Sequence, residues 1–592
     1  MNKFFASIAV AASAFALASC SNDEPIVDGG ANVESDGKMY TTLTLSLPQA
    51  GRSETIKPDD NTNSNDGYEV GLDPENQVGS ILVVLAKQET DGSYTYLTSN
   101  RGEAHKVANT GNRPTYNMQF ETRKLYDNEN EEVYVFAFCN PTSKLIEAAD
   151  AGFTDGFVDA MGNLADASIS INNNFLMANA SKTKKVLPSK DDMDNTYNTP
   201  EKPFFLGVVE VSRVTARFDF KETTFKDQTV ANRYPIYDHN VSDVDDEGNV
   251  TTSTVVMGYV TLTGKALMNE ALSYYYLPRV SDTDAWTNPD ICGAETPNTF
   301  VVSPWYEDKS AEKLTLQFIT DNYRSSVKAT DADFWTSEGA VFENLTYDAI
   351  GTNLGDDNED DSTWGEGSNL TAAQKKDYKI WKYVSENTIP GVNDQRKGIT
   401  TGVVFKGKIE AAETANEDLK TVLKEAKNAL YMYGGKLYGD FAMLKKFVTS
   451  PENSSSMVTE SFKIAYEDQI TGKTEEEINA SINAITEEIL TGKDGFTIYR
   501  PSGNEYPVYY PYYNRHWDNA NNTQMAAMEF ATVRNNIYKL SINSILEFGH
   551  PGKPGDDPDP DEPNDPDETP KTYFRVQVRV LPWVVRVNNI DL

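Results

Sequence analysis

The sequence predicts a mainly β protein with two β-sandwich-like domains and a few short helices. Aromatic residues make up 11% of the chain, with 31 Tyr and 26 Phe, and such residues favour the pleated, half-buried surface of a strand. Short apolar runs such as Ile81–Ala86 and Val133–Cys139 are typical of strands in a sandwich core. The length of 592 residues exceeds that of a usual single domain, so we expect more than one core.

The first residues have the pattern of an export signal, which we place at residues 1–19. Lys3 precedes an apolar run from Phe4 to Leu17, and this run is shorter than the roughly 20 residues that a membrane-spanning helix needs. The letters "LASC", ending at Cys20, are similar to a bacterial lipobox. We expect lipidation of Cys20 and a lipid-anchored propeptide over residues 20–52. The alternative is an ordinary signal peptide with a chance cysteine.

A clean strand pattern follows within this propeptide, at Met39–Leu47. Its large apolar residues share one face of the expected strand: Met39, Leu43, Leu45 and Leu47. Removing such a strand would expose a groove and two strand edges, at a cost on the order of 10 kcal/mol. Arg52, in the turn-like "QAGRSE", offers a cleavage point for a trypsin-like protease, with Ser53 as the new N-terminus. The sequence therefore predicts a removable strand, which we call the plug strand.

Further strand patterns divide the rest of the chain into domains. The alternating run Phe204–Phe220 closes an expected N-terminal domain at residues 53–221, and an expected C-terminal domain covers residues 222–550. Strands of the second domain are expected at Val255–Leu267, Ser273–Leu277 and Thr400–Ile409.

Helical signals are few. Thr474–Leu490 begins with the capping-box pair Thr474 and Glu477 and carries an isoleucine stripe. Asn416–Asn428 and Asn522–Asn535 are further helix candidates, because each begins with a capping residue.

The end of the chain reads as a tethered strand. An acidic, proline-rich linker covers residues 551–571; its central part, Gly555–Pro570, holds eight acidic residues and five prolines and reaches roughly 50 Å if extended. Residues 572–592 then form a donor segment, meaning a strand that could fill the groove of another molecule. Its apolar residues alternate with Arg575, Gln577 and Arg579. They are Phe574, Val576, Val578 and Val580, followed by Trp583, Val585 and Val587. The second group could continue along a groove or fold back as a hairpin, and the sequence leaves both open.

Charge and motif content argue against several functions. The formal net charge is −37, from 53 Lys and Arg against 90 Asp and Glu, which repels nucleic acid. We found no metal-binding, phosphate-binding or nucleophile motif, so we expect no enzyme, no cofactor and no metal. "DVDDEG" at Asp243–Gly248 begins like a calcium loop, but Thr254 stands where a glutamate is required. "DDNEDD" at Asp356–Asp361 could collect a divalent ion weakly, but we expect a solvated acidic loop.

Two smaller questions concern single residues. Cys139 and Cys292 could form one disulfide, which spacing cannot decide. His516, in "YYNRHWDN", is expected to be a hydrogen-bonded histidine among aromatic residues.

Several motifs together resemble the fimbrillins of type V pili, particularly the Mfa-type major subunits. Besides the lipobox, the plug strand and Arg52, they are "VYVFAFCNPT" (Val133–Thr142), "VEVSRVTARFDF" (Val209–Phe220), "YVSENT" (Tyr383–Thr388), "QRKGITTGVVFKGKI" (Gln395–Ile409), "YYNRHWDN" (Tyr512–Asn519), "VRNNIYKLSI" (Val533–Ile542) and the ending "VLPWVVRVNNIDL".

This resemblance implies a structural role. The family implies two transthyretin-like β-sandwich domains, export as a palmitate-bearing lipoprotein to the outer membrane, cleavage by an arginine-specific protease, and strand exchange between identical subunits. Arg52 would then be the maturation site and the C-terminal strands the donor. Anchor and tip pilus proteins, and host or bacterial surface ligands in adhesion and biofilm formation, would be the other partners.

Two other classes of protein were weighed. A surface glycan-binding lipoprotein that does not polymerise would use exposed aromatic residues as stacking platforms, and Tyr509–Tyr513 with Trp517 could form one. A secreted hydrolase would need a nucleophile with a base or a pair of carboxylates, and no such spacing was identified.

Overall fold

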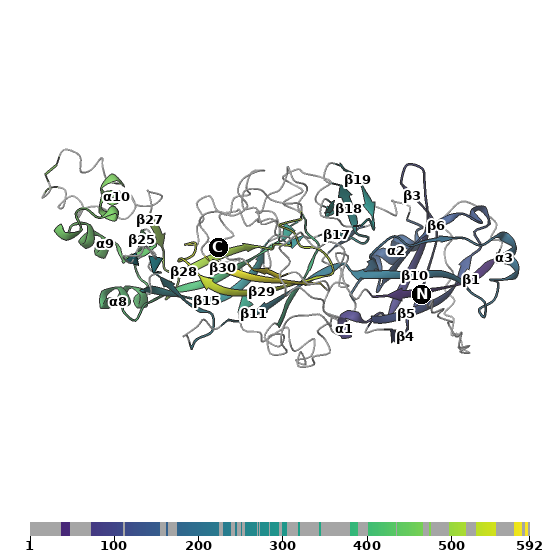
Figure 1. Cartoon of the computed structure of the whole chain (residues 1–592), viewed down its shortest axis with the longest axis horizontal. Coiled ribbons are helices and arrows are strands. Elements are labelled where there is room, and N and C mark those ends of the chain that lie inside the picture. The colour runs from purple at the N-terminus through teal and green to yellow at the C-terminus, as the bar shows by residue number, and fades with distance from the viewer. Residues whose placement is uncertain are drawn as a thin grey trace, which may run out of the picture.

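The protein is elongated in the computed structural model, with the first domain at one end and a helical region at the other (Figure 1). The structure describes residues 37–47, 73–110, 113–153, 161–163, 175–223, 229–237, 243–244, 250–251, 255–268, 270–271, 273–282, 285–294, 299–304, 318–319, 343–344, 379–388, 401–433, 435–465, 473–474, 477, 496–516, 528–551, 574–582 and 587–589.

The first domain is built on a nine-stranded sheet in the order β3-β2-β6-β8-β10-β1-β5-β4, with β9 paired to β6. Its strands are β1 (Lys38–Ser46), β2 (Ser80–Gln88), β3 (Tyr94–Glu103), β4 (His105–Thr110), β5 (Arg113–Arg123), β6 (Glu132–Cys139), β8 (Met177–Asn179), β9 (Lys184–Val186) and β10 (Phe204–Arg213). The short helices α1 (Asp73–Asn76), η1 (Tyr126–Asn128), α2 (Ser143–Asp150) and α3 (Lys190–Asn195) connect them. Apolar side chains of β1, β2, β5, β6 and β10 form one buried cluster, so the sheet encloses a core.

The second domain contains two five-stranded sheets. One has the order β23-β11-β29-β30-β31, and the other the order β12-β15-β24-β28 with β22 on β15. The strands of the first are β11 (Thr215–Lys221), β23 (Lys379–Ser385), β29 (Asn536–Ile545), β30 (Phe574–Pro582) and β31 (Val587–Asn589). Those of the second are β12 (Arg233–Tyr237), β15 (Val256–Met268), β22 (Glu343–Asn344), β24 (Gly402–Ala411) and β28 (Pro507–Tyr513). Phe218 and Trp381 from one sheet and Phe405 and Tyr510 from the other share a core, which makes the pair a sandwich.

A helical region is inserted between β24 and β28. It contains α8 (Glu417–Glu425), α9 (Phe441–Val448), η7 (Pro451–Asn453), α10 (Met457–Ala465) and the small sheet β25 (Leu430–Tyr433), β26 (Lys436–Gly439) and β27 (Phe496–Tyr499). Asn416 caps α8 by accepting a bond from the Leu419 amide, as its position in the sequence predicts. The region has its own small core around Tyr431, Leu444 and Phe462, and it forms the end of the molecule opposite the first domain (Figure 1).

Minor strands complete the described chain. They are β7 (Met161–Asn163), β13 (Asp243–Val244), β14 (Val250–Thr251), β16 (Glu270–Ala271), β17 (Ser273–Tyr275), β18 (Arg279–Asp282), β19 (Ala285–Ile291), β20 (Thr299–Val301) and β21 (Phe318–Ile319). Residues next to β17 and β19, including Tyr276 and Ile291, pack on the outer face of β2 and β6. The second domain therefore covers part of the first.

The predicted fold class, mainly β with sandwich-like domains and short helices, is confirmed. The Thr474–Glu477 capping box is present, with the Thr474 amide donating to Glu477 Oε2 over 2.8 Å, but most of the helix expected there lies outside the described residues. The helix expected at Asn522–Asn535 is wrong for residues 528–535, which are turn and coil. Their backbone groups bond elsewhere: the Thr532 amide donates to the Asn387 carbonyl over 2.7 Å.

The run Phe204–Phe220 is divided between the two domains. β10 lies in the first-domain sheet, whereas β11 pairs with β23 and β29 of the second domain. Sheet membership thus changes at Val214, and the expected domain boundary at residue 221 stays a prediction. Cys139 and Cys292 are both buried and not bonded to each other.

Candidate functional site: the groove of the plug strand

The predicted plug strand is an internal strand of the first domain. β1 pairs antiparallel with β5, from Lys38 opposite Arg123 to Ser46 opposite Thr115. On its other side it runs parallel to β10, from Thr41 opposite Phe204 to Ser46 opposite Glu210. β1 therefore separates two strands that would both have free edges without it.

The inner face of β1 is fully packed. Met39, Leu43 and Leu45 have no exposed surface and Leu47 is 3% exposed. Burying large apolar side chains is worth about 1.5–3 kcal/mol each, so these residues together stabilise the domain by roughly 6–12 kcal/mol. The structure thus places the predicted apolar residues in the core.

The outer face of β1 is polar and makes specific contacts with β5. Thr44 Oγ1 donates to Asn117 Oδ1 over 2.9 Å. At the other end, Lys38 Nζ lies 2.8 Å from Glu121 Oε2, and the Tyr40 hydroxyl donates to Glu121 Oε1 over 3.1 Å. The hydrogen bond from Lys38 lowers the pKa of Glu121. The ionised carboxylate therefore binds the side chains of both Lys38 and Tyr40.

A bulge interrupts the pairing of β1 with β10 between Thr42 and Leu43. Gly207 of β10 lies opposite Leu43 with φ of 124°, a backbone conformation that favours glycine.

The residues expected to be processed lie outside the described part of the chain. Cys20, Arg52 and Ser53 belong to this group. The described chain resumes at α1.

The expected donor segment forms strands in the second domain. β30 pairs antiparallel with β29, from Ile545 opposite Phe574 to Asn536 opposite Pro582. β31 folds back on β30, with Arg579 opposite Val587, which is the hairpin arrangement of the two left open by the sequence. Trp583 and Val585 lie outside the described residues. In Figure 1 β30 lies beside β29, well away from β1.

A buried charge cluster at the junction of the domains was missed by sequence reasoning. Arg217 Nη1 lies 2.8 Å from Glu75 Oε1, and Arg217 Nε lies 2.8 Å from Asp219 Oδ1. Lys539 Nζ is 3.0 Å from Asp219 Oδ2. Burial opposes the charged form of Asp219, but Arg217 and Lys539 outweigh it and lower the pKa of Asp219.

This cluster joins α1 of the first domain to strands of the second. The Tyr383 hydroxyl of β23 donates to Glu75 Oε1 over 2.5 Å, and Arg213 Nε donates to the Glu75 carbonyl over 2.8 Å. Burial and the neighbouring Glu75 carboxylate raise the pKa of Tyr383. The available signal in the sequence was Arg217, two positions before Asp219 within a strand pattern. The partner of Arg217, Glu75, is distant in sequence, so this local pattern could not identify it.

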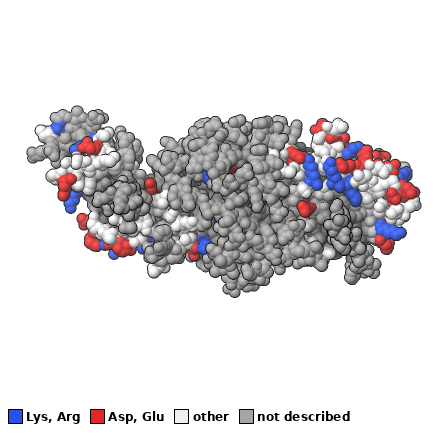
Figure 2. Space-filling view, in the orientation of Figure 1, with Lys and Arg blue, Asp and Glu red and all other residues white. Residues whose placement is uncertain are grey.

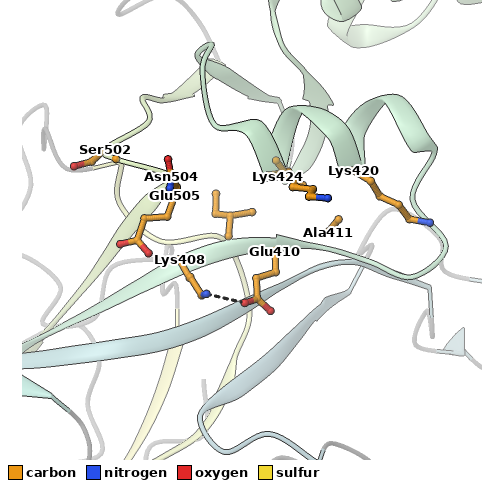
Figure 3. Close-up of a pocket in the computed structure, with 11 residues that line it drawn as sticks. Lys408, Glu410, Ala411, Lys420, Lys424, Ser502, Asn504 and Glu505 are labelled. Carbon is orange, nitrogen blue, oxygen red and sulfur yellow. Dashed lines mark ion pairs between the residues drawn. The ribbon is translucent and has the colours of Figure 1, made fainter.

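A cavity of about 620 Å³ lies between α8 and β24 (Figure 3). Lys408, Glu410, Lys420, Lys424 and Glu505 are among its lining residues, which include no histidine or cysteine. Lys408 and Glu410 pair over 3.2 Å. The lining of this cavity thus carries charged groups of both signs.

The remaining site expectations concern metals, membranes and aromatic platforms. Within the described ranges no group of three or more His, Cys, Asp or Glu residues could hold a metal ion, and no helix there is long and apolar enough to cross a membrane. His516 is buried, with Nδ1 2.8 Å from the Tyr538 hydroxyl, as expected. Tyr510, Tyr512 and Tyr513 are buried, so this part of the expected glycan platform belongs to the core. Trp517 lies outside the described residues.

The charged side chains are not segregated on the surface. Figure 2 shows Lys and Arg interspersed with Asp and Glu on the described atoms of both ends of the molecule. This face of the first domain therefore presents no broad surface of one charge.

Comparison with known proteins assigns the C-terminal part of the chain. Residues 504–589 match the family described as major fimbrial subunit protein type IV, fimbrillin, C-terminal. The match covers β28, β29, β30 and β31. Residues 504–589 therefore match a fimbrillin model, in agreement with the resemblance that the motifs predict.

The solved structures that align with this chain include three from Parabacteroides and Porphyromonas. A proposed cell adhesion protein from Parabacteroides distasonis has 12% identity and a TM-score of 0.38, over 92% of this chain and 99% of that one. A fimbrilin from Porphyromonas gingivalis has 14% identity and a TM-score of 0.33, over 93% and 99%. A fimbrial assembly protein from P. distasonis has 9% identity and a TM-score of 0.23, over 64% and 97%. At these values the likeness bears on neither partners nor mechanism. No curated protein matches the chain.

Proposed function

We propose that the protein is a pilin that is exported as a lipoprotein on Cys20, cleaved between Arg52 and Ser53, and polymerised by strand exchange. The observation that carries the proposal is the position of β1. It is an internal strand with a fully buried apolar face, yet it belongs to the part of the chain before the cleavage site. Its loss would leave two free strand edges around an apolar groove, which only another strand can satisfy.

The C-terminal strand is the proposed replacement. β30 lies at the second-domain sheet, where it pairs with β29 on one side and only with the short β31 on the other. Because it lies far from the β1 groove of its own molecule, an adjacent copy is the natural recipient (Figure 1). Residues 20–52 would then form the propeptide, 53–221 and 222–550 the two domains, 551–571 the linker and 572–592 the donor.

This cycle implies a location and a set of partners. The lipid would hold the precursor at the outer membrane before cleavage, and the mature subunit would enter an extracellular fimbrial shaft for adhesion and biofilm formation. An arginine-specific protease, identical subunits, and anchor and tip proteins would be the partners.

The test is controlled cleavage of the purified precursor. Limited trypsin treatment should yield an N-terminus at Ser53 by mass spectrometry and filaments by electron microscopy. An Arg52→Ala precursor should stay monomeric under the same treatment, because the plug strand remains tethered to its domain.

A matched control is Arg101→Ala, since Arg101 is half-exposed and its side-chain contact is a 3.6 Å ion pair with Asp150. This variant should be cleaved at Arg52 and polymerise like the wild type. Filaments that contain intact chains beginning at Cys20 would overturn the proposal.

A further inference from the structure

The carboxylate of Glu121 stands out on the rim of the β1 groove. It is the residue of β5 to which both Lys38 and Tyr40 of β1 are bound, over 2.8 and 3.1 Å. When β1 leaves, Glu121 loses both contacts at once. A replacing strand therefore meets a fixed acceptor for one cation and one hydroxyl, two residues apart on the same face.

The C-terminal segment repeats this spacing. β1 and its end read "KMYTTLTLSL" from Lys38 to Leu47, and the segment from Lys571 to Val580 reads "KTYFRVQVRV". Both begin with a lysine, any residue and a tyrosine, and both continue with alternating residues. In this alignment Lys571 takes the position of Lys38, and Tyr573 that of Tyr40.

The same alignment fills the apolar positions of the groove. Val576, Val578 and Val580 take the positions of Leu43, Leu45 and Leu47, all of which are buried. At the two remaining inner positions, Thr572 takes the place of Met39 and Phe574 takes the place of Thr41. The large and the small side chain therefore exchange positions. Pro582 then falls beyond the last paired position, where the missing backbone donor costs nothing.

Neighbouring registers fit less well. A shift of the donor by two residues in one direction puts Phe574 at the position of Met39 and Arg575 opposite Glu121, but brings Pro582 into the buried position of Leu47. A shift the other way puts Lys571 at the position of Tyr40, opposite Glu121, but moves Tyr573 on to the position of Thr42 and brings Pro570 into the buried position of Met39. A reversed strand presents its lysine and tyrosine at the wrong end.

We propose that Glu121 sets the register of strand exchange by binding Lys571 and Tyr573 of a second copy of this chain. The inference rests on the proposed function and adds to it a specificity-determining residue. The Lys38 and Glu121 side chains are 66% and 43% exposed, so a pair here contributes little to affinity. Charge pairs at a rim instead steer association and fix register.

The experiment separates donor and acceptor activities. The acceptor is the chain truncated after Thr569 and cleaved at Arg52, which has a groove but no donor. The donor is the full chain carrying Cys20→Ser and Arg52→Ala, which has a donor but a filled groove. A mixture can then form only a one-to-one dimer, measured by size-exclusion chromatography.

Register is read by disulfide cross-linking. Asn117 lies opposite Thr44, and the proposed register puts Gln577 at the Thr44 position. Directly opposed antiparallel residues lie within disulfide distance. An Asn117→Cys acceptor should therefore cross-link to a Gln577→Cys donor and not to Arg575→Cys or Arg579→Cys donors. Cross-linking to either arginine position instead would overturn the register.

The role of Glu121 is read by charge exchange. A Glu121→Lys acceptor should form the dimer about tenfold more slowly, because like charges would then face each other. A Lys571→Glu donor should restore the rate, whereas an Arg579→Glu donor should not. An unchanged rate with Glu121→Lys, or rescue by Arg579→Glu, would overturn the role of Glu121. If the unmodified pair forms no dimer, the proposed function itself fails.

Discussion

At the scale of single residues, the buried charges explain how the two domains are joined. Glu75 is fully buried and lies between Arg217 and the Tyr383 hydroxyl. A buried carboxylate of this kind is tolerated only because charged partners and hydrogen bonds surround it. Since α1 carries Glu75 and follows Arg52, the proposed cleavage site, the contact should remain after cleavage.

Removing Glu75 should therefore destabilise the junction strongly. We expect Glu75→Ala to lower the free energy of unfolding by about 3–5 kcal/mol, because the Arg217 guanidinium would stay buried with one partner fewer. Urea unfolding of the precursor, followed by fluorescence, measures this change.

The matched control is Glu147→Ala on α2, which removes an exposed carboxylate. Exposed substitutions usually change stability by no more than about 0.5 kcal/mol. Equal midpoints for the two variants would contradict a structural role for Glu75.

The sequence could not have predicted this cluster. Arg213 and Arg217 lie in an alternating run, where charged residues normally face solvent. Both faces of β11 are buried instead, with Phe218 in the second-domain core and Arg217 against α1. Glu75 gives no local signal, because pairing across more than a hundred residues depends on how the domains pack.

At the scale of elements, alternating strand patterns were the best predictors of the observed structure. The strand expected at Met39–Leu47 is β1 at Lys38–Ser46, because strict alternation fixes both the element and its buried face. Its neighbours could not be predicted in the same way. Parallel pairing with β10 joins segments far apart in the chain, and no short-range pattern encodes it.

The plug strand should stabilise the precursor but leave assembly untouched. We expect Leu43→Ala to destabilise the precursor by about 2–5 kcal/mol, because it opens a cavity at a fully buried position. Once β1 has been cleaved and removed, the mature subunits should polymerise at the wild-type rate, as measured by light scattering.

Thr44→Ala provides the comparison on the outer face of the same strand. It removes one bond to Asn117 and no core packing, so a loss of about 1 kcal/mol or less is expected. A lasting effect of Leu43→Ala on the assembly rate of purified mature subunits would indicate that β1 stays in the filament.

At the scale of the whole molecule, the proposed acceptor and the proposed donor lie in different domains that contact each other. The groove of β1 belongs to the first domain and β30 to the second, and the Glu75 cluster and the packing of Tyr276 on β6 connect them. This separation is what the proposed strand exchange requires, since it favours filling a neighbouring subunit over filling the same one.

The long linker is the remaining feature to test at this scale. β30 pairs antiparallel with β29, beginning with Ile545 opposite Phe574, and an antiparallel pair needs only a short turn to connect it. The acidic segment Gly555–Pro570 is therefore longer than pairing within the molecule requires. Extended, it would span roughly 50 Å, enough to carry the strand to an adjacent subunit.

Shortening this linker should separate pairing within the molecule from exchange between molecules. Replacing Gly555–Pro570 by a four-residue Gly/Ser turn should leave a folded, cleavable subunit that forms no filaments, because the donor can no longer reach a neighbouring groove. A Gly/Ser segment of the original length should still polymerise, more slowly, since a flexible chain spans less distance on average than an extended one. Electron microscopy after trypsin treatment distinguishes the two. Filaments from the short-linker variant would show that strand exchange does not need a long linker. The donor strand would then act from the surface of its own domain.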